Sequence, residues 1–142
     1  MLNQYQHLLL PMDFSEKNQV ALDSAYNIVS QNPARLTLLH VIEPIGIIDD
    51  DEIQDFTDQL VARADSELKT RAAQFSDLDV DVVCTTQVGN RSRTVTAFAV
   101  DNNVDLIIVS SHPIQEVHSA RSMASVSYQI AVLANCAVLL LK

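Results

Sequence analysis

Glycine is scarce in this chain: its 142 residues include only two. The stretch SSHPIQEVHSARSMAS at residues 110–125 has none, although it lies between the apolar run DLIIV and the segment VSYQIAVLA. We expect these flanking segments to be a buried strand and a helix. A strand that turns into a helix is where many folds hold a phosphate, usually with glycines. Either no phosphate site lies here, or other residues now occupy it.

Basic residues are also few. Nine Lys and Arg stand against 18 Asp and Glu, which gives a formal net charge of −9. This balance argues against a nucleic-acid binder, which needs a basic face, and against docking on an anionic membrane. No apolar run approaches the roughly 20 residues that span a bilayer. The N-terminus MLNQYQHLLLPMD has no basic region and too short an apolar stretch for a signal peptide. We therefore expect a cytoplasmic protein.

The chain has only two cysteines, Cys84 and Cys136, and both fall in apolar, β-branched runs. Buried, reduced thiols are typical of such positions in a cytosolic protein. No basic residue flanks either cysteine to stabilise a thiolate, so the sequence disfavours a redox role.

Apolar runs and helical periodicities alternate along the chain, and no repeat or linker interrupts them. Five strands alternating with four helices predict one α/β domain over residues 1–142, with a parallel sheet covered by helices on both faces. Ser15 is the expected N-cap of the first helix. Ile53, Phe56, Leu60 and later apolar residues form an unbroken stripe along the second. The expected strands are residues 7–12, 35–44, 78–88, 104–111 and 136–142, and the expected helices are 15–31, 50–75, 92–103 and 122–134.

In open parallel sheets, ligands bind beyond the carboxyl ends of the strands, where the strand order reverses. The residues expected at that edge are Pro11, Met12, Asp13, Phe14, Ser15, His40, Val41, Glu43, Gly89, Asn90, Arg91, Arg93, Ser110, Ser111 and His112. Asp13 has two possible roles there, because its carboxylate could cap a turn or face a pocket.

Four features follow one another along the chain: LLLPMDFSEKNQVAL, LTLLHVIEP, a lone glycine after the third strand and VDLIIVSSH. In their order and spacing they resemble the universal stress protein family, over essentially the whole chain. The resemblance implies a Rossmann-like open sheet of five parallel strands in the order 3-2-1-4-5. It also implies a homodimer through the fifth strand, from Cys136 to Lys142.

Some family members bind ATP with a loop of pattern G-x2-G-x9-G-(S/T), and others lack the loop and do not bind nucleotide appreciably. In this chain Ser110, Pro113 and Ala124 stand where the three glycines would be, and the loop has one extra residue. Glycines let backbone N–H groups approach phosphate oxygens, and proline has no N–H to offer. The resemblance thus implies the variant without the ATP loop. Any remaining nucleotide contacts would come from Pro11, Met12, Asp13, Val41, Ser110, His112, Ser125 and Val126.

Basic residues gather at the same edge. Lys17, Arg91, Arg93, Arg121 and Lys142 are expected there, with His112 and His118. Arg91 and Arg93 lie near a helix start, where the helix dipole disfavours cations. Our hypothesis is that Arg91, Arg93, His118 and Arg121 bind an anion through side chains. The rival interpretation is that these bases form ion pairs with the acidic run at residues 49–58. The acidic run itself is explained most simply as a complement to the dipole of the helix that begins there, and a divalent-cation site is the less simple explanation.

Other chemistries are weaker. Asp13, His40 and His112 could supply three metal ligands, but their spacing matches no metal motif, so we predict no metal. Ser111 and His112 are adjacent strand-end residues that cannot easily pair, and the nucleophile-elbow motif is absent. The sequence therefore favours a non-enzymatic, homodimeric stress protein without an ATP cofactor. An ATP or AMP sensor using Asp13, Val41 and Ser125 is the alternative, and a hydrolase is a weaker one.

Overall fold

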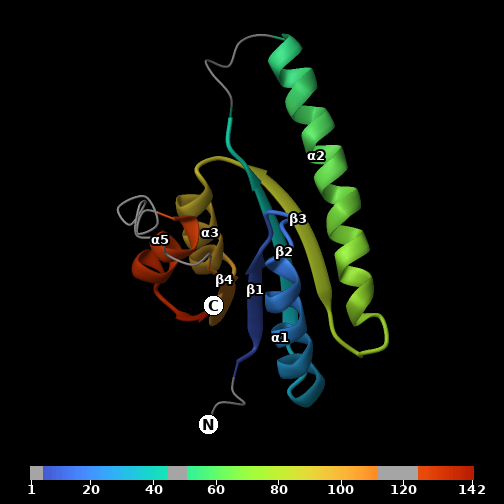
Figure 1. The fold of residues 1–142 in the computed structure, drawn as a ribbon, viewed down its shortest axis with the longest axis vertical. Helices are drawn as coiled ribbons and strands as arrows, with labels where there is room; N and C mark the ends of the chain where they lie inside the picture. Colours follow the sequence, from blue (N-terminus) through green and yellow to red (C-terminus); the bar gives the residue numbers. More distant parts are fainter. Residues whose placement is uncertain (1–4, 45–50, 112–124) are drawn as a thin grey trace.

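The structure is a computed structural model that describes residues 5–44, 51–111 and 125–142 (Figure 1). Within these residues five strands alternate with four α-helices, and a 3-10 turn follows the second helix. The elements are β1 (His7–Pro11), α1 (Asn18–Gln31), β2 (Arg35–Ile42), α2 (Asp51–Ala72), η2 (Ala73–Phe75), β3 (Val82–Val88), α3 (Arg91–Asp101), β4 (Leu106–Ser110), α5 (Val126–Leu133) and β5 (Ala137–Leu141).

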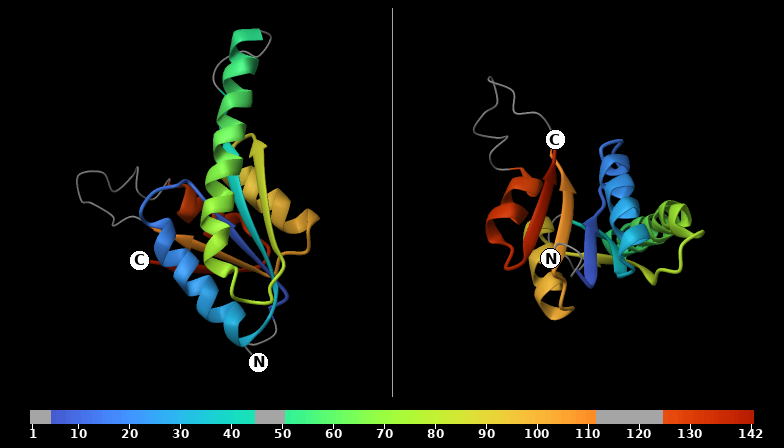
Figure 2. Two further views of the ribbon diagram at one scale, coloured as in Figure 1. Left: turned by 90° about the vertical axis from the view of Figure 1, so that its right-hand side faces the viewer. Right: turned by 90° about the horizontal axis from the view of Figure 1, so that it is seen from below.

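The strands form one parallel sheet in the order β3-β2-β1-β4-β5, which confirms the predicted topology. Its helices lie in two layers, with α1 and α2 on one face and α3 and α5 on the other (Figure 2). Side chains of one strand alternate between the layers. Leu8 and Leu10 of β1 pack toward α1, and Leu9 packs toward α3 and α5. All three are fully buried, so the continuous apolar run follows from burial on both faces.

The first helix begins later than predicted. It starts at Asn18, after Lys17 as N-cap, and the Ser15 side chain caps nothing. The Ser15 hydroxyl is buried without a hydrogen-bond partner among the described residues. Ser15 was the wrong N-cap because residues 13–17 first complete a turn, in which the carbonyl of Ser15 accepts a hydrogen bond from the N–H of Asn18.

The second helix ends at Ala72, three residues before the predicted end, and the chain continues as the 3-10 turn η2 to Phe75. Only the C-terminal half of α2 is covered. Ala64 and Leu68 are buried, whereas Phe56 is 48% exposed. In Figure 1 the N-terminal half of α2 extends past the end of the sheet, so the apolar stripe has no sheet to pack on there. The last helix was predicted from residue 122, and its described part begins at Val126. None of the described helices has the length and apolar character that a bilayer span requires.

Candidate functional site

A small crevice lies at the carboxyl ends of β1 and β4, where the strand order reverses. Its volume is about 90 Å³. Seven predicted residues meet in it, from five separate parts of the chain: Pro11, Met12, Asp13, Val41, Arg91, Ser110 and Val126. The sequence reasoning missed the remaining lining residues, which are Asn18, Leu39, Val95, Val109, Ser127 and Ile130. Most of these are ordinary core residues by type, so no local signal marked them.

Asn18 shapes the turn that forms one wall of the crevice. Its buried side-chain Oδ1 accepts hydrogen bonds from the backbone N–H groups of Asp13, at 3.0 Å, and Phe14, at 2.7 Å. Phe14 has a positive φ of 65°, which a bulky residue rarely adopts. The Asn18 amide therefore stabilises an unfavourable backbone turn. Its place just after the first strand, at a helix start, is the signal that could have identified it.

Asp13 combines both of its predicted roles. Its Oδ1 accepts a hydrogen bond from the N–H of Ser15 at 2.9 Å, which closes an Asx turn. The exposed residue also lines the crevice.

Two serines connect the elements around the crevice. The Ser127 hydroxyl donates to the carbonyl of Ser110, and the Ser110 hydroxyl donates to the carbonyl of Lys17, each at 2.7 Å. We call this pair of hydrogen bonds the serine tie. It links α5 through the end of β4 to the start of α1. Ser110 therefore uses its hydroxyl within the fold, at the position where the resemblance would place a glycine.

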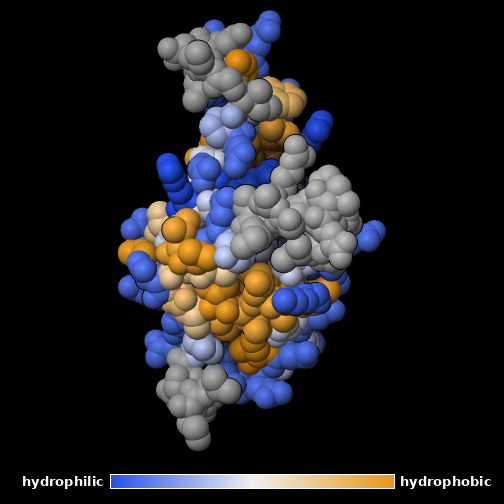
Figure 3. Space-filling model, turned by 60° about the vertical axis from the view of Figure 1, so that its left-hand side comes forward, coloured by the Kyte–Doolittle hydropathy of each residue, from blue (hydrophilic) through white to orange (hydrophobic). Residues whose placement is uncertain are grey.

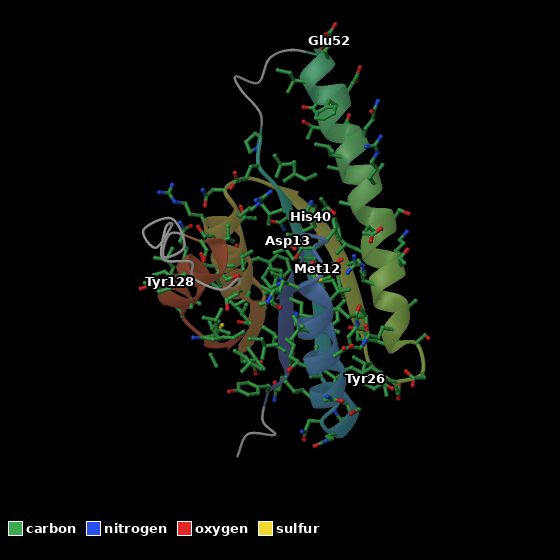
Figure 4. All side chains as sticks on the ribbon, viewed as in Figure 1. Met12, Asp13, Tyr26, His40, Glu52 and Tyr128 are labelled. Atoms are coloured by element: carbon green, nitrogen blue, oxygen red, sulfur yellow. The ribbon has the colours of Figure 1, made fainter. Side chains whose placement is uncertain are left out.

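His40 lies at the end of β2, on the α1 and α2 face of the sheet. Its ring stacks on Phe14 with centroids 4.4 Å apart. Its Nδ1 lies 2.7 Å from the carbonyl oxygen of Met12. A carbonyl can only accept, so Nδ1 carries the proton. Figure 4 shows Met12, Asp13 and His40 together at this end of the sheet.

Of the predicted anion-binding residues, the two that the structure describes, Arg91 and Arg93, line different hollows. Arg91 lines the crevice, but Arg93 lines a separate hollow with Gln87 and Phe98. Asn90 caps α3 by accepting a hydrogen bond from the N–H of Arg93 at 3.1 Å. Among the described residues the ion pairs are Arg35–Asp81 and Arg71–Glu67, so neither Arg91 nor Arg93 pairs with the described acids of α2.

Ser125 is the N-cap of α5. Its Oγ accepts a hydrogen bond from the N–H of Tyr128 at 3.3 Å, and the residue does not line the crevice. The predicted residues His112, His118 and Arg121 lie outside the described residues, as do Pro113 and Ala124.

Three serine hydroxyls at this edge of the sheet make hydrogen bonds within the fold. Both crevice hydroxyls donate to backbone carbonyls, and the Ser111 hydroxyl donates to the carbonyl of Leu141 at 3.2 Å. All three acceptors are backbone carbonyls, which cannot activate a hydroxyl as a base would. Over residues 5–44, 51–111 and 125–142, no group of His, Cys, Asp and Glu could hold a metal ion.

Neither cysteine is an activated thiol. Both are free and half-buried. Burial raises the pKa of the Cys84 thiol, with Lys69 lowering it and Asp65 raising it. Burial and then Asp105 raise the pKa of Cys136, against a smaller lowering by a backbone hydrogen bond. Both thiols are therefore protonated near neutral pH.

Comparison with known proteins gave one family. A family model described as the universal stress protein family matches residues 4–142. Among solved structures, the chain is similar to the universal stress protein UspA from Lactobacillus plantarum, with a TM-score of 0.82, 22% identity and coverage of 97% of this chain and 98% of that one. It is also similar to the hypothetical protein MJ0577, with a TM-score of 0.81, 24% identity and coverage of 97% and 96%.

A third similar structure is a universal stress protein in complex with cAMP, with a TM-score of 0.73, 20% identity and coverage of 96% of each chain. At these identities the similarity of structure shows the fold. The search of curated proteins gave no match.

Proposed function

This chain belongs to the universal stress protein family, and we propose that it acts there as a non-enzymatic, homodimeric regulator that does not use ATP. The observation that carries the proposal is the crevice at the end of β1 and β4. Its volume of about 90 Å³ is well below the roughly 300 Å³ at which small-molecule pockets begin. Nucleotide binding would require the crevice to open.

The serine tie supports the same conclusion. A phosphate cradle needs backbone N–H groups that a ligand can approach closely. Here Ser110 carries a side chain at the first cradle position, and its hydroxyl donates a hydrogen bond to the backbone carbonyl of Lys17. In the sequence, Pro113 and Ala124 occupy the other two glycine positions. Opening the crevice would break the tie and still leave a loop without glycine.

A titration with ATP and magnesium tests this proposal. A ligand at 100 times its Kd stabilises a folded protein by about 2.7 kcal/mol. For a domain of this size that corresponds to a rise in Tm of about 8 °C. We expect 1 mM ATP with magnesium to leave the Tm unchanged relative to magnesium with tripolyphosphate, which controls for ionic effects. A rise of several degrees specific to ATP would contradict the proposal.

A nucleotide sensor is the second candidate, because one similar structure holds cAMP and another, from Archaeoglobus fulgidus, holds dAMP. Asp13 and Val41 both line the crevice here, so part of an adenine site could persist. AMP, cAMP and ATP should therefore be titrated side by side. If AMP and cAMP stabilise the protein and ATP does not, the sensor is favoured. The binding energy would then come mainly from contacts with the base.

The homodimer is proposed through β5. This strand pairs with β4 on one side, and among the described strands it has no neighbour on the other. An apolar edge of this kind pairs with another chain unless it is protected. Tyr128, Val132 and Leu133 of the adjacent α5 are large, exposed apolar residues. Figure 3, which brings the side of α5 toward the viewer, shows apolar residues gathered in the middle of that surface.

The backbone directions in β5 allow a specific test. The carbonyl of Leu141 accepts a hydrogen bond from Ser111, which follows β4. Alternate residues of a strand direct their N–H and C=O to opposite sides, so Leu140 directs its N–H to the free edge. Leu140→Pro should therefore yield monomers while β4 and β5 stay paired. Leu140→Ala is the matched control, because it shortens the side chain but keeps the N–H.

Sedimentation velocity distinguishes the outcomes. We expect a dimer for the wild type and for Leu140→Ala, and a folded monomer for Leu140→Pro. A wild-type monomer at micromolar concentration would contradict the proposed dimer. Far-UV circular dichroism checks that the proline variant folds. A cytoplasmic location, with neither nucleic acid nor membrane as partner, completes the proposal and is supported by the net charge of −9.

A further inference from the structure

A second hollow lies on the opposite face of the sheet from the crevice. It is a groove between α2 and the carboxyl end of β2, with a volume of about 510 Å³. The walls of the crevice include Val95 of α3 and Ile130 of α5, whereas α2 forms one side of the groove. We call it the α2 groove, and its lining residues are Phe14, His40, Val41, Ile42, Glu43, Leu60, Arg63, Ala64, Glu67 and Arg91.

The floor of the α2 groove is apolar and partly aromatic. Leu60 and Ala64 come from α2, and Ile42 comes from β2. The stacked rings of Phe14 and His40 form another part of the surface, and both rings are half-buried. Flat ring surfaces beside aliphatic side chains suit a planar apolar group. The volume falls within the roughly 300–1,000 Å³ that small-molecule sites occupy.

At the rim of the α2 groove the acidic side chains have contacts, whereas the arginine side chains have no ion-pair partner among the described residues. Glu67 forms an ion pair with Arg71 at 3.2 Å, and Glu43 accepts a long hydrogen bond from the N–H of Arg91 at 3.4 Å. The side chains of Arg63 and Arg91 have no ion-pair partner within the part of the chain that the structure describes. Two guanidinium groups are therefore left to bind an anion, since the acids beside them already have contacts.

We propose that the α2 groove binds a small aromatic anion. The ring contacts Phe14, His40 and Leu60, and a carboxylate or phosphate contacts Arg63 and Arg91. This site lies on the α2 side of the sheet, and its occupancy does not require a nucleotide in the crevice. Val41 and Arg91 line both hollows, so occupancy of one could be sensed at the other.

Backbone NMR of the ¹⁵N-labelled wild-type protein tests the site directly. Phenyl phosphate and benzoate are the probes, benzyl alcohol is the neutral control, and inorganic phosphate is the anion without a ring. We expect both probes to shift the amides of Leu60, Arg63 and Ala64, with saturable binding in the millimolar range or tighter. Benzyl alcohol and inorganic phosphate should shift them several-fold less at the same concentration.

Arg63→Gln is the decisive variant, because Arg63 lines the α2 groove and not the crevice. It should raise the Kd of phenyl phosphate about tenfold, the scale expected for one charge-assisted hydrogen bond. Arg93→Gln makes the same charge change but lies in a different hollow, so it should leave the Kd within about twofold.

The outcomes divide clearly. Shifts confined to Val95, Val126 and Ile130 would place the probe in the crevice and overturn the proposal. If benzyl alcohol binds as tightly as the two probes, the arginines do not contribute to binding. If inorganic phosphate binds as tightly as the probes, the aromatic floor does not contribute. The Kd expected here is in the millimolar range, so a probe concentration of about 20 mM lies roughly tenfold above it. An absence of amide shifts up to that concentration would refute the site altogether.

Discussion

Removing the Ser110 hydroxyl tests whether the serine tie holds the crevice in its small form. Ser110→Ala deletes the donor that reaches the carbonyl of Lys17 at 2.7 Å. It leaves the second bond in place, because the Ser127 hydroxyl donates to the backbone carbonyl of residue 110 and not to its side chain. One hydrogen bond of this kind stabilises a protein by about 1 kcal/mol. For a chain of this length that is about 3 °C in Tm.

Ser127→Ala removes the other half of the tie and should cost a similar amount. Because Ser110 and Ser127 are in contact, the double variant measures their coupling energy, which is about 0.5–3 kcal/mol for contacting residues. Ser30→Ala is the matched control: its hydroxyl donates to the carbonyl of Asn27 at 2.9 Å, but on the exposed surface of α1 and within one helix turn. Alanine has the higher helix propensity, so this variant should be neutral or slightly stabilising.

Urea unfolding at a fixed protein concentration measures the three changes, because a dimer would make stability depend on concentration. The reasoning fails if Ser110→Ala and Ser127→Ala are both as neutral as Ser30→Ala. The tie would then be an incidental contact, and the crevice would be small for another reason.

Three further outcomes follow from the site and the core. Asn18→Ala should lower the free energy of unfolding by about 2 kcal/mol, since two backbone N–H groups lose their acceptor. Asn18→Asp keeps an acceptor oxygen and should lose much less stability than Asn18→Ala. Equal losses in the two variants would contradict this prediction. Gly89→Ala should destabilise by about 1 kcal/mol, because a Cβ there would come within 2.5 Å of the Thr94 Oγ1; Thr94→Ala should relieve the loss, which a double-mutant unfolding cycle measures. In a Cys136→Ser background, the iodoacetamide reaction of Cys84 should become fast only at a higher pH than for a free thiol, because burial raises the pKa of Cys84; rapid reaction at neutral pH would refute this.

The alternation of strands and helices and their two layers could be predicted because the sequence pattern is consistent along its whole length, whereas the strand order was implied by the family resemblance. Runs such as residues 36–39, which are buried throughout, are explained only by a sheet covered on both faces. The start of α1 could not be predicted from local preference. Ser15 is a good N-cap by type, but Asn18 uses its side chain to stabilise the preceding turn, and the helix begins after that turn.

The candidate site was predicted in part. Residues at strand ends follow directly from the topology, so Pro11, Val41 and Ser110 were placed correctly at one edge. Whether Arg91 and Arg93 act together depends on the direction of each side chain from α3, and the structure separates them. The α2 groove could not be foreseen, because it depends on how far along β2 the second helix packs. A stripe of apolar residues gives the face of a helix but not its offset along the sheet.

We propose that this universal stress protein does not carry a nucleotide. The most direct measurement is to denature the purified protein, remove the precipitate and quantify adenine nucleotides in the supernatant against the protein concentration. We predict much less than one nucleotide per ten chains, with buffer passed through the same purification as the blank. A near-stoichiometric amount of ATP, AMP or a cyclic nucleotide would contradict the account and would favour the sensor.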